Sequence, residues 1–261
     1  MDDQVRTSPR VSLVITLYNR AGYVAEAIES VLAQTFEDWE LVVWDDGSTD
    51  GSGEIARGYA ERDERVRYVR DERNRGMYFA LHDGLALTAG GYLGWVDSDD
   101  RLLAGALERC VGVLEARAEV GMVYTDHVEM DEEGRELRVG GRCGIPYSKN
   151  RLLRDFMTFH FRLMRREVLE AAGGIDVRFG YAEDYDLCLR VSEVTEVEHL
   201  REVLYAYRVH QQSISRASRL GQIEGSATAV RRALRRRGLE TRYDLVVELV
   251  PRFHVVPIEG D

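Results

Sequence analysis

The sequence predicts an α/β fold in which a mostly parallel central sheet is flanked by helices. Short apolar, β-branched runs alternate with segments whose apolar residues recur at helical spacing, and turn-forming residues follow most of the runs. Strands that alternate with helices pair in parallel through right-handed crossovers, which bring their carboxyl ends to one edge of the sheet. Ligand sites in such sheets lie at that edge.

The first hundred residues carry this pattern most clearly. Val11 to Leu17 is apolar with little alternation, as expected for a strand buried on both faces. Val24, Ala27, Ile28, Val31 and Leu32 then form one helical stripe. The expected order is strand 11–17, a helix that carries this stripe and ends near the turn-prone region 34–38, strand 40–44, helix 54–61, strand 66–69, helix 77–87 and strand 92–96.

The second half of the chain is less regular. A helix is expected to include Leu102, Leu103, Leu107, Val111 and Leu114, and a strand to follow at 121–125. Residues 131–148 are rich in Gly and charge, which indicates a loop or edge hairpin. Near the end we expect a basic helix with five arginines between 231 and 237 and an apolar, strand-like segment at 245–258.

Composition limits the classes of function. The formal net charge of −11 argues against broad nucleic-acid binding, because neutralising phosphates needs a basic face. The polar first ten residues do not resemble a signal peptide, and no apolar run reaches the length of a membrane span, so a cytoplasmic protein is expected. The basic helix is either a solvated face or a contact for the inner face of a membrane. Three scattered cysteines indicate neither a disulfide framework nor a zinc site.

The most informative motif is Asp97-Ser98-Asp99-Asp100, directly after the strand expected at 92–96. Side chains alternate along a strand, so Asp97 and Asp99 should project to the same side where the chain leaves the sheet. Two carboxylates there suit Mg²⁺ or Mn²⁺, which would bridge them to the phosphates of a nucleotide. On its own the motif is equally compatible with a helix-capping turn.

Two further segments follow predicted strands. Asp45 and Asp46 begin the run DDGSTD, and a carboxylate at a strand end can accept hydrogen bonds from a base or a ribose. Thr16 and Tyr18 end the first strand, where an aromatic ring can stack on a base. Each segment alone is more typical of turns, caps or packing.

Taken in order, the motifs resemble those of the family 2 glycosyltransferases, whose fold is of the GT-A nucleotide-sugar-binding type. The resemblance runs from about Val11 to Ser215 and includes the Asp-x-Asp triplet at 97–99. The other shared segments are Tyr18-Asn19, DDGSTD, Asn74-Arg75-Gly76, Gly173-Gly174-Ile175-Asp176, Glu183-Asp184 and Tyr207-Arg208-Val209-His210.

This resemblance implies an inverting, metal-dependent transferase that moves a sugar from a nucleoside diphosphate, with UDP favoured, to a saccharide, lipid-linked or protein acceptor. It implies a transferase domain over 1–215, with a nucleotide-binding half near 10–100 and an acceptor and catalytic half near 101–215. A helix and strand extension at 216–261 should pack on it. The implied roles are catalytic base for Asp184, metal ligands for Asp99 and His210, and donor contacts for Thr16, Tyr18, Asp45, Asp46, Arg75, Asp97, Ser98 and Arg208.

Physical chemistry agrees with placing the base and the metal ligands apart, since inverting transfer needs an acidic group on the acceptor side and a cationic site on the leaving-group side. Mutual repulsion and partial burial among Glu183, Asp184 and Asp186 should raise one of their pKa values. Three other classes stay open: a non-catalytic nucleotide-sugar-binding domain, a nucleotidyltransferase and an NAD-dependent oxidoreductase. The last rests on the GxGxxA pattern at 51–56, which follows the second strand rather than the first.

Overall fold

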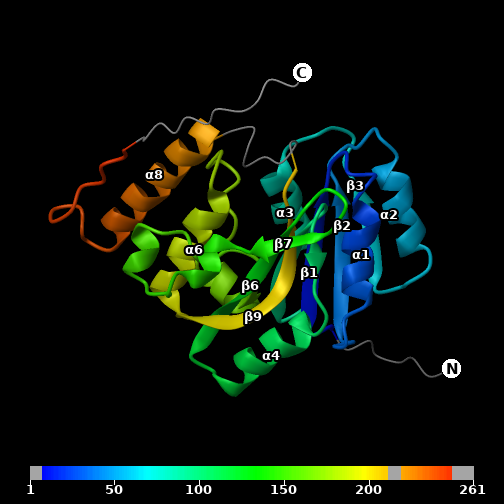
Figure 1. Cartoon of the computed structure of the whole chain (residues 1–261), viewed down its shortest axis with the longest axis horizontal. Helices are drawn as coiled ribbons and strands as arrows, with labels where there is room; N and C mark the ends of the chain where they lie inside the picture. The colour runs from blue at the N-terminus through cyan, green and yellow to red at the C-terminus, as the bar shows by residue number, and fades with distance from the viewer. Residues whose placement is uncertain (1–7, 211–218, 249–261) are drawn as a thin grey trace, which may run out of the picture.

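The computed structural model describes residues 8–210 and 219–248. Nine strands form one sheet in the order β3-β2-β1-β4-β8-β6-β9-β5, and β7 pairs with β6 (Figure 1). The strands are β1 (Val11–Leu17), β2 (Trp39–Asp45), β3 (Val66–Arg70), β4 (Tyr92–Asp97), β5 (Arg101–Leu102), β6 (Val120–Met130), β7 (Glu136–Val139), β8 (Arg162–Arg165) and β9 (Glu196–Arg208).

The predicted α/β class is confirmed. Strand β1 pairs in parallel with β2 and β4, and β2 with β3, which makes the first half of the sheet parallel. Strand β8 makes the whole sheet mixed, because it lies antiparallel between β4 and β6. The chain reaches β8 through the irregular segment after β7 and not through a crossover helix.

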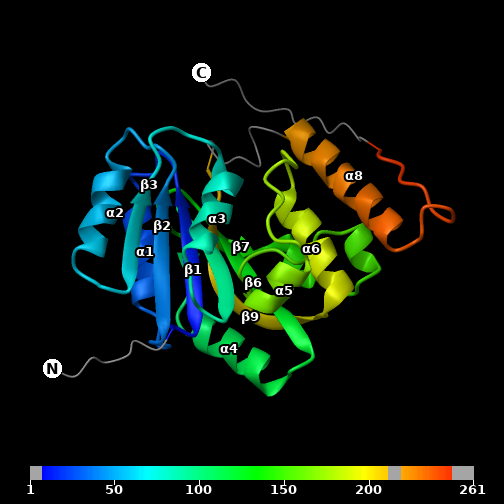
Figure 2. The same ribbon diagram turned by 180° about the vertical axis from the view of Figure 1, so that it is seen from behind.

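Helices cover both faces of the sheet (Figure 2). They are α1 (Val24–Leu32), α2 (Ser52–Ala60), α3 (Met77–Ala86), α4 (Ala106–Ala116), α5 (Arg166–Ala171), α6 (Glu183–Val194) and α8 (Arg219–Arg236), with 3-10 turns η1 (Gly141–Gly144) and η2 (Arg151–Leu153). Alternate residues of β1 separate the two cores: Leu13 and Ile15 pack with α1 and α4, whereas Val14 packs with residues of α3. Helices α6 and α8 lie side by side beyond β9.

Several boundaries differ from the sequence-based expectation. Leu102 belongs to the short strand β5, which pairs with β9, so α4 starts only at Ala106. Strand β6 runs five residues further than predicted and forms the edge hairpin with β7. Residues 245–248 form no strand, and the rest of the predicted terminal strand lies outside the described residues. In the part of the chain that the structure describes, no helix is long and apolar enough to cross a membrane.

The turn after β4 is fixed to β9 by a buried carboxylate. Asp100 is fully buried and accepts hydrogen bonds from the Tyr205 hydroxyl at 2.8 Å and from the Arg208 backbone N–H at 2.7 Å. The same hydroxyl accepts the Asp97 backbone N–H at 3.1 Å. A buried polar group without a partner is costly, so this network holds the acidic turn and the end of β9 in one arrangement.

We predict that Tyr205→Phe lowers the free energy of unfolding by about 1–3 kcal/mol, because the Asp97 N–H and an Asp100 oxygen each lose a buried partner. Urea denaturation measures this change. Tyr243→Phe, which removes a hydroxyl from an exposed ring, is the control and should change stability by less than about 0.5 kcal/mol. Equal midpoints for both variants would show that the network does not hold the turn.

Candidate active site

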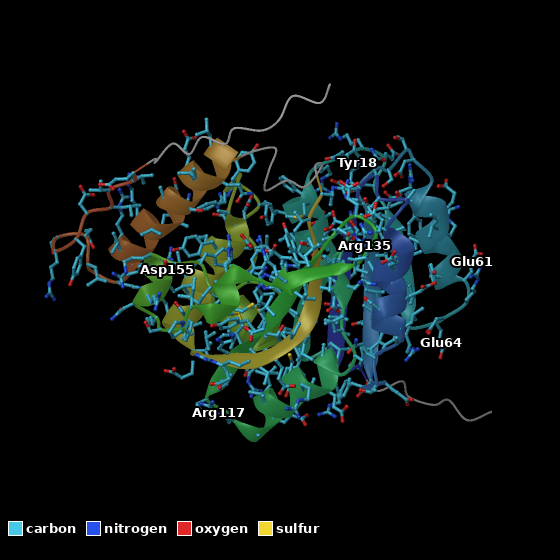
Figure 3. The ribbon with its side chains drawn as sticks, in the orientation of Figure 1. Tyr18, Glu61, Glu64, Arg117, Arg135 and Asp155 are labelled. Atoms are coloured by element: carbon cyan, nitrogen blue, oxygen red, sulfur yellow. The ribbon has the colours of Figure 1, made fainter. Side chains whose placement is uncertain are left out.

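A cavity of about 1280 Å³ opens at the carboxyl edge of the parallel strands. Figure 3 shows Tyr18 at this upper edge, with Arg117 at the opposite end of the molecule. One wall comes from the ends of β1 and β4 and the start of α3, and the other from the start of α6, α8 and the segment around η1 and η2. The cavity therefore lies where ligands of open α/β sheets bind.

Most of the predicted site residues meet in this one cavity. Its lining includes Thr16, Tyr18, Asp46, Arg75, Asp97, Ser98, Asp99, Asp184 and Arg208. Asp45 and His210 are not among the described lining residues. His210 instead reaches the site through Asp99, whose carboxylate it contacts with Nε2 at 2.9 Å.

The carboxylate of Asp99 is held between two partners. The Arg20 guanidinium Nε donates to its Oδ2 at 3.0 Å, and the His210 ring contacts the same oxygen. Burial alone would raise the pKa of Asp99, but the His210 contact and the Arg20 charge outweigh it and lower that pKa. Asp99 is thus kept ionised, as a cation ligand must be.

Asp97 stands in a different environment. Its Oδ2 lies 3.3 Å from Nε2 of His160. Burial and the neighbouring charge of Asp99 raise its pKa to about 7. Burial and the charges of Asp99 and Asp97 also raise the pKa of Asp100 well above its usual value. Three carboxylates in one turn create a strongly negative region that an added positive charge would relieve.

The residues of this turn fit a hard divalent cation. Asp97, Asp100 and His160 offer ligand atoms within 4.8 Å of one another. Both oxygens of Asp100 already accept hydrogen bonds inside the protein, whereas Asp97 and Asp99 face the cavity. Carboxylate oxygens are ligands that suit Mg²⁺ or Mn²⁺.

Asp45 and Asp46 have opposite surroundings. Asp46 lines the cavity and accepts the backbone N–H groups of Arg75 and Gly76 at 2.8 and 2.7 Å. Asp45 is fully buried, and its Oδ2 accepts hydrogen bonds from Tyr68 and Arg70, each at 2.7 Å. The expected place of Asp45 beside the donor base is therefore corrected, because its carboxylate is used to join β2 to β3.

Asp184 lies on the facing wall, in the first turn of α6. Ala182 precedes the helix with φ of 63°, and this left-handed residue turns the chain into the cavity. The carboxylate accepts the Tyr185 backbone N–H at 2.8 Å, and its other oxygen lies 3.4 Å from the buried guanidinium of Arg162. About a fifth of the side chain (22%) is exposed, so an acceptor can reach it.

The acidic residues in the first turn of α6 lie in different environments. Burial raises the pKa of Glu183 to about 7, whereas Asp186 is buried in an ion pair with Arg190 at 2.7 Å. The predicted raised pKa therefore belongs to Glu183, which also lines the cavity.

Arg208 is a fully buried side chain whose guanidinium is committed to the protein. It donates to the Asp99 carbonyl at 2.7 Å, to the Glu132 carbonyl at 2.8 Å and to the Glu26 carboxylate at 2.8 Å. A contact with a phosphate would require one of these bonds to be exchanged. In this arrangement Arg208 fixes the backbone of the acidic turn.

Three residues of the site were not predicted: Arg20, Arg162 and Tyr205. Their partners lie far away in the sequence. Arg20 meets Asp99 from 79 positions away and Tyr205 meets Asp100 from 105. No local pattern marks such contacts, although Arg20 directly follows the Tyr18-Asn19 motif.

The sequence of this chain is similar to those of several known proteins. Chondroitin synthase from Escherichia coli is 31% identical over 89% of this chain, and hyaluronan synthase from Pasteurella multocida 29% identical over 91%. The chain spans only 34% and 24% of these two relatives. The uncharacterized glycosyltransferase EpsJ of Bacillus subtilis is 30% identical over 79% of this chain and 63% of its own length.

Solved structures share the fold. The mannosyltransferase PcManGT of Pyrobaculum calidifontis, in complex with GDP-Man and Mn²⁺, superposes with a TM-score of 0.69 over 88% of this chain and 65% of its own, at 21% identity. TarS 1–349 of S. aureus, in complex with UDP, gives 0.64 over 90% of this chain and 76% of its own, at 19% identity. Residues 12–173 match the family model described as Glycosyl transferase family 2. This match covers more than half of the chain, which therefore belongs to glycosyl transferase family 2.

Proposed function

We propose that this chain is an inverting glycosyltransferase that moves a sugar from a nucleoside diphosphate sugar, with UDP as the favoured nucleotide, to an acceptor hydroxyl. The observation that carries the proposal is that Asp99 and Asp184 line facing walls of one cavity. An anionic site that can take a cation and a separate carboxylate base are what such a transfer needs.

The proposed step uses Asp184 as the general base. Its carboxylate takes the proton of the acceptor hydroxyl while that oxygen forms a bond to the anomeric carbon of the donor sugar. The bond between this carbon and the diphosphate oxygen breaks, and its electron pair leaves with the diphosphate. Attack from the face opposite the leaving group inverts the anomeric configuration. Arg162 holds one Asp184 oxygen at 3.4 Å and so orients the base.

Asp99 and His210 would hold the Mg²⁺ or Mn²⁺ ion, with Asp97 beside them. Such an ion supplies positive charge that stabilises the departing diphosphate. Support for a metal comes from the ligand atoms that Asp97, Asp100 and His160 bring together beside Asp99, and from the Mn²⁺ present with GDP-Man in PcManGT. Arg20 already pairs with Asp99, so it is placed to share this charge compensation.

The donor nucleoside is proposed to lie along the ends of β1 and β2. Tyr18 is 44% exposed, which leaves its ring free to stack on a base. Asp46 holds the turn at Arg75 and Gly76, while Arg75 pairs with Asp83 at 2.8 Å and lies over the Phe79 ring. Thr16, Asp97 and Ser98 complete the proposed donor side near the ribose. UDP is favoured because TarS binds UDP and UDP-GlcNAc.

A dinucleotide-binding role for the GxGxxA pattern is not supported. A Cβ atom at Gly53 would lie 2.5 Å from Oδ2 of Asp45 and 2.6 Å from the Tyr68 hydroxyl. Glycine is therefore needed there so that α2 can pack against β2 and β3. The pattern is explained by helix packing, without a pyrophosphate.

The cellular setting is proposed from the relatives. The similarity to synthases of chondroitin and hyaluronan supports a role in polysaccharide or cell-surface glycan synthesis. A membrane contact through the basic face of α8 has less support, because Arg232, Arg236 and Arg237 pair with Asp176 and Glu193. These ion pairs attach α8 to the rest of the domain.

UDP should stabilise the protein only in the presence of Mn²⁺ or Mg²⁺, because the acidic turn repels a bare diphosphate. At a UDP concentration a hundredfold above its Kd, the gain is about 2.7 kcal/mol, which a thermal-shift assay detects. Asp99→Asn should abolish the stabilisation that UDP gives in the presence of metal. Asp155→Asn, an exposed change outside the cavity, should retain this stabilisation. Stabilisation by NAD but not by UDP with metal would contradict the proposal.

The variant Asp184→Asn should bind UDP and metal as the unaltered protein does but transfer sugar about 10²–10⁴-fold more slowly, since an amide cannot accept the hydroxyl proton. Transfer is followed by release of UDP from a UDP-sugar panel, with Asp155→Asn as the matched control. Near-normal turnover by Asp184→Asn would remove this residue from the mechanism.

A further inference from the structure

Two arginines on the Asp184 side of the cavity form no ion pair with any residue that the structure describes. The guanidinium of Arg142 lies over the ring of Phe159, 4.6 Å from its centroid, and 5.1 Å from that of Phe156. Arg142 and Arg154 both line the cavity. Within residues 8–210 and 219–248, neither guanidinium makes a hydrogen bond or an ion pair. This contrasts with Arg20 and Arg208, which are bound to carboxylates.

The loop that carries Arg142 is held in place. The Gly140 N–H donates to the His127 carbonyl at 2.9 Å, and the His127 N–H lies 3.3 Å from Sγ of Cys143. A side chain at Gly140 would overlap the His127 ring, so glycine permits the close approach. The His127 ring in turn packs on Phe159 at 5.0 Å between centroids. Arg142 is therefore positioned by the fold.

The surroundings of Arg142 suit an anion. Desolvation by the surrounding protein lowers the pKa of Arg142, the nearby charge of Asp184 opposes this shift, and the side chain is exposed to the cavity. A guanidinium binds carboxylate or phosphate through two parallel N–H donors, and this pairing strengthens where water is excluded. The rings of Phe156 and Phe159 add flat apolar surface beside the cation.

The position of this group points to the acceptor rather than to the donor diphosphate. Phe156 packs against Tyr185 at 4.7 Å between ring centroids, and Tyr185 directly follows Asp184 in the first turn of α6. The other end of the cavity, at Asp99, has its own cation in Arg20. An anionic group on the Arg142 wall would therefore accompany the molecule whose hydroxyl approaches Asp184.

We propose that Arg142, Arg154, Phe156 and Phe159 form an anion subsite that binds a carboxylate or phosphate carried by the acceptor saccharide. The inference rests on the proposed transfer to an acceptor at Asp184 and narrows its substrate class to anionic glycans. Arg142 binds the charged group, and the two rings support the adjoining sugar.

The test measures binding of three probes by titration calorimetry in the presence of UDP and Mn²⁺ at low salt. The probes are p-nitrophenyl β-glucuronide, glucose 6-phosphate and p-nitrophenyl β-glucoside. We expect at least one anionic probe to bind about tenfold or more tightly than the glucoside, a difference of about 1.4 kcal/mol. The tighter anionic probe identifies a carboxylate or a phosphate as the natural group.

Arg142→Met keeps an apolar side chain over the rings and removes the charge. It should therefore reduce the preference for the anionic probe over the glucoside to about twofold and leave binding of the glucoside unchanged. Arg67→Met, on the exposed edge strand β3 and outside the cavity, removes the same charge and should retain the preference. Equal binding of all three probes, or binding of none, would overturn the anion subsite. So would an Arg142→Met variant that loses UDP affinity instead.

Stabilisation by UDP with Mn²⁺ is recorded separately for each protein. If UDP with Mn²⁺ stabilises the protein but neither anionic probe binds more tightly than the glucoside, the anion subsite alone is refuted. Absence of this stabilisation from the unaltered protein refutes the proposed transferase function, so the two failures are distinguishable.

Discussion

Asp100, buried just after the end of β4, accepts hydrogen bonds from the Tyr205 hydroxyl and from the Arg208 backbone N–H, and the rest of the site depends on these two bonds. They fix the acidic turn to the last residues of β9. As a result His210, 111 positions further along the chain, meets the Asp99 carboxylate. The cost of burying Asp100 is offset by these two bonds, which also leave the carboxylates of Asp97 and Asp99 directed at the cavity.

Because these hydrogen bonds hold the acidic turn in place, the two walls of the cavity carry different charged groups. On the β4 side, carboxylates gather with Arg20 as their only direct guanidinium partner among the described residues, which favours a cation and a diphosphate. On the α6 side, Asp184 is accompanied by arginines, one of them buried beside it and two exposed to the cavity. An acceptor activated on one wall and a leaving group stabilised at the other require this division. In the proposed reaction, the same fold would orient both substrates.

Much of the fold could be predicted because local patterns determine it. The doubly buried run of β1 was placed at its observed limits, and the apolar stripe identified α1, although the helix ends at Leu32, before the expected region 34–38. Strand β5 was missed because two residues pair with a strand about a hundred positions away. Adjacent Asp45 and Asp46 look alike in sequence, but only the three-dimensional position of Tyr68 and Arg70 decides that Asp45 is structural. Arg142 carries no local signal, because its role depends on rings from another segment and on its place in the same cavity as Asp184.

We propose that the carboxylate of Asp99 binds a divalent ion together with a nucleoside diphosphate, across the cavity from Asp184. This proposal can be tested with an anomalous difference map from crystals grown with UDP and Mn²⁺. We expect a manganese peak shared by the Asp99 carboxylate, His210 and the diphosphate. A peak coordinated by Asp184, or UDP bound in the cavity with no manganese at Asp99, would show that the proposal is wrong.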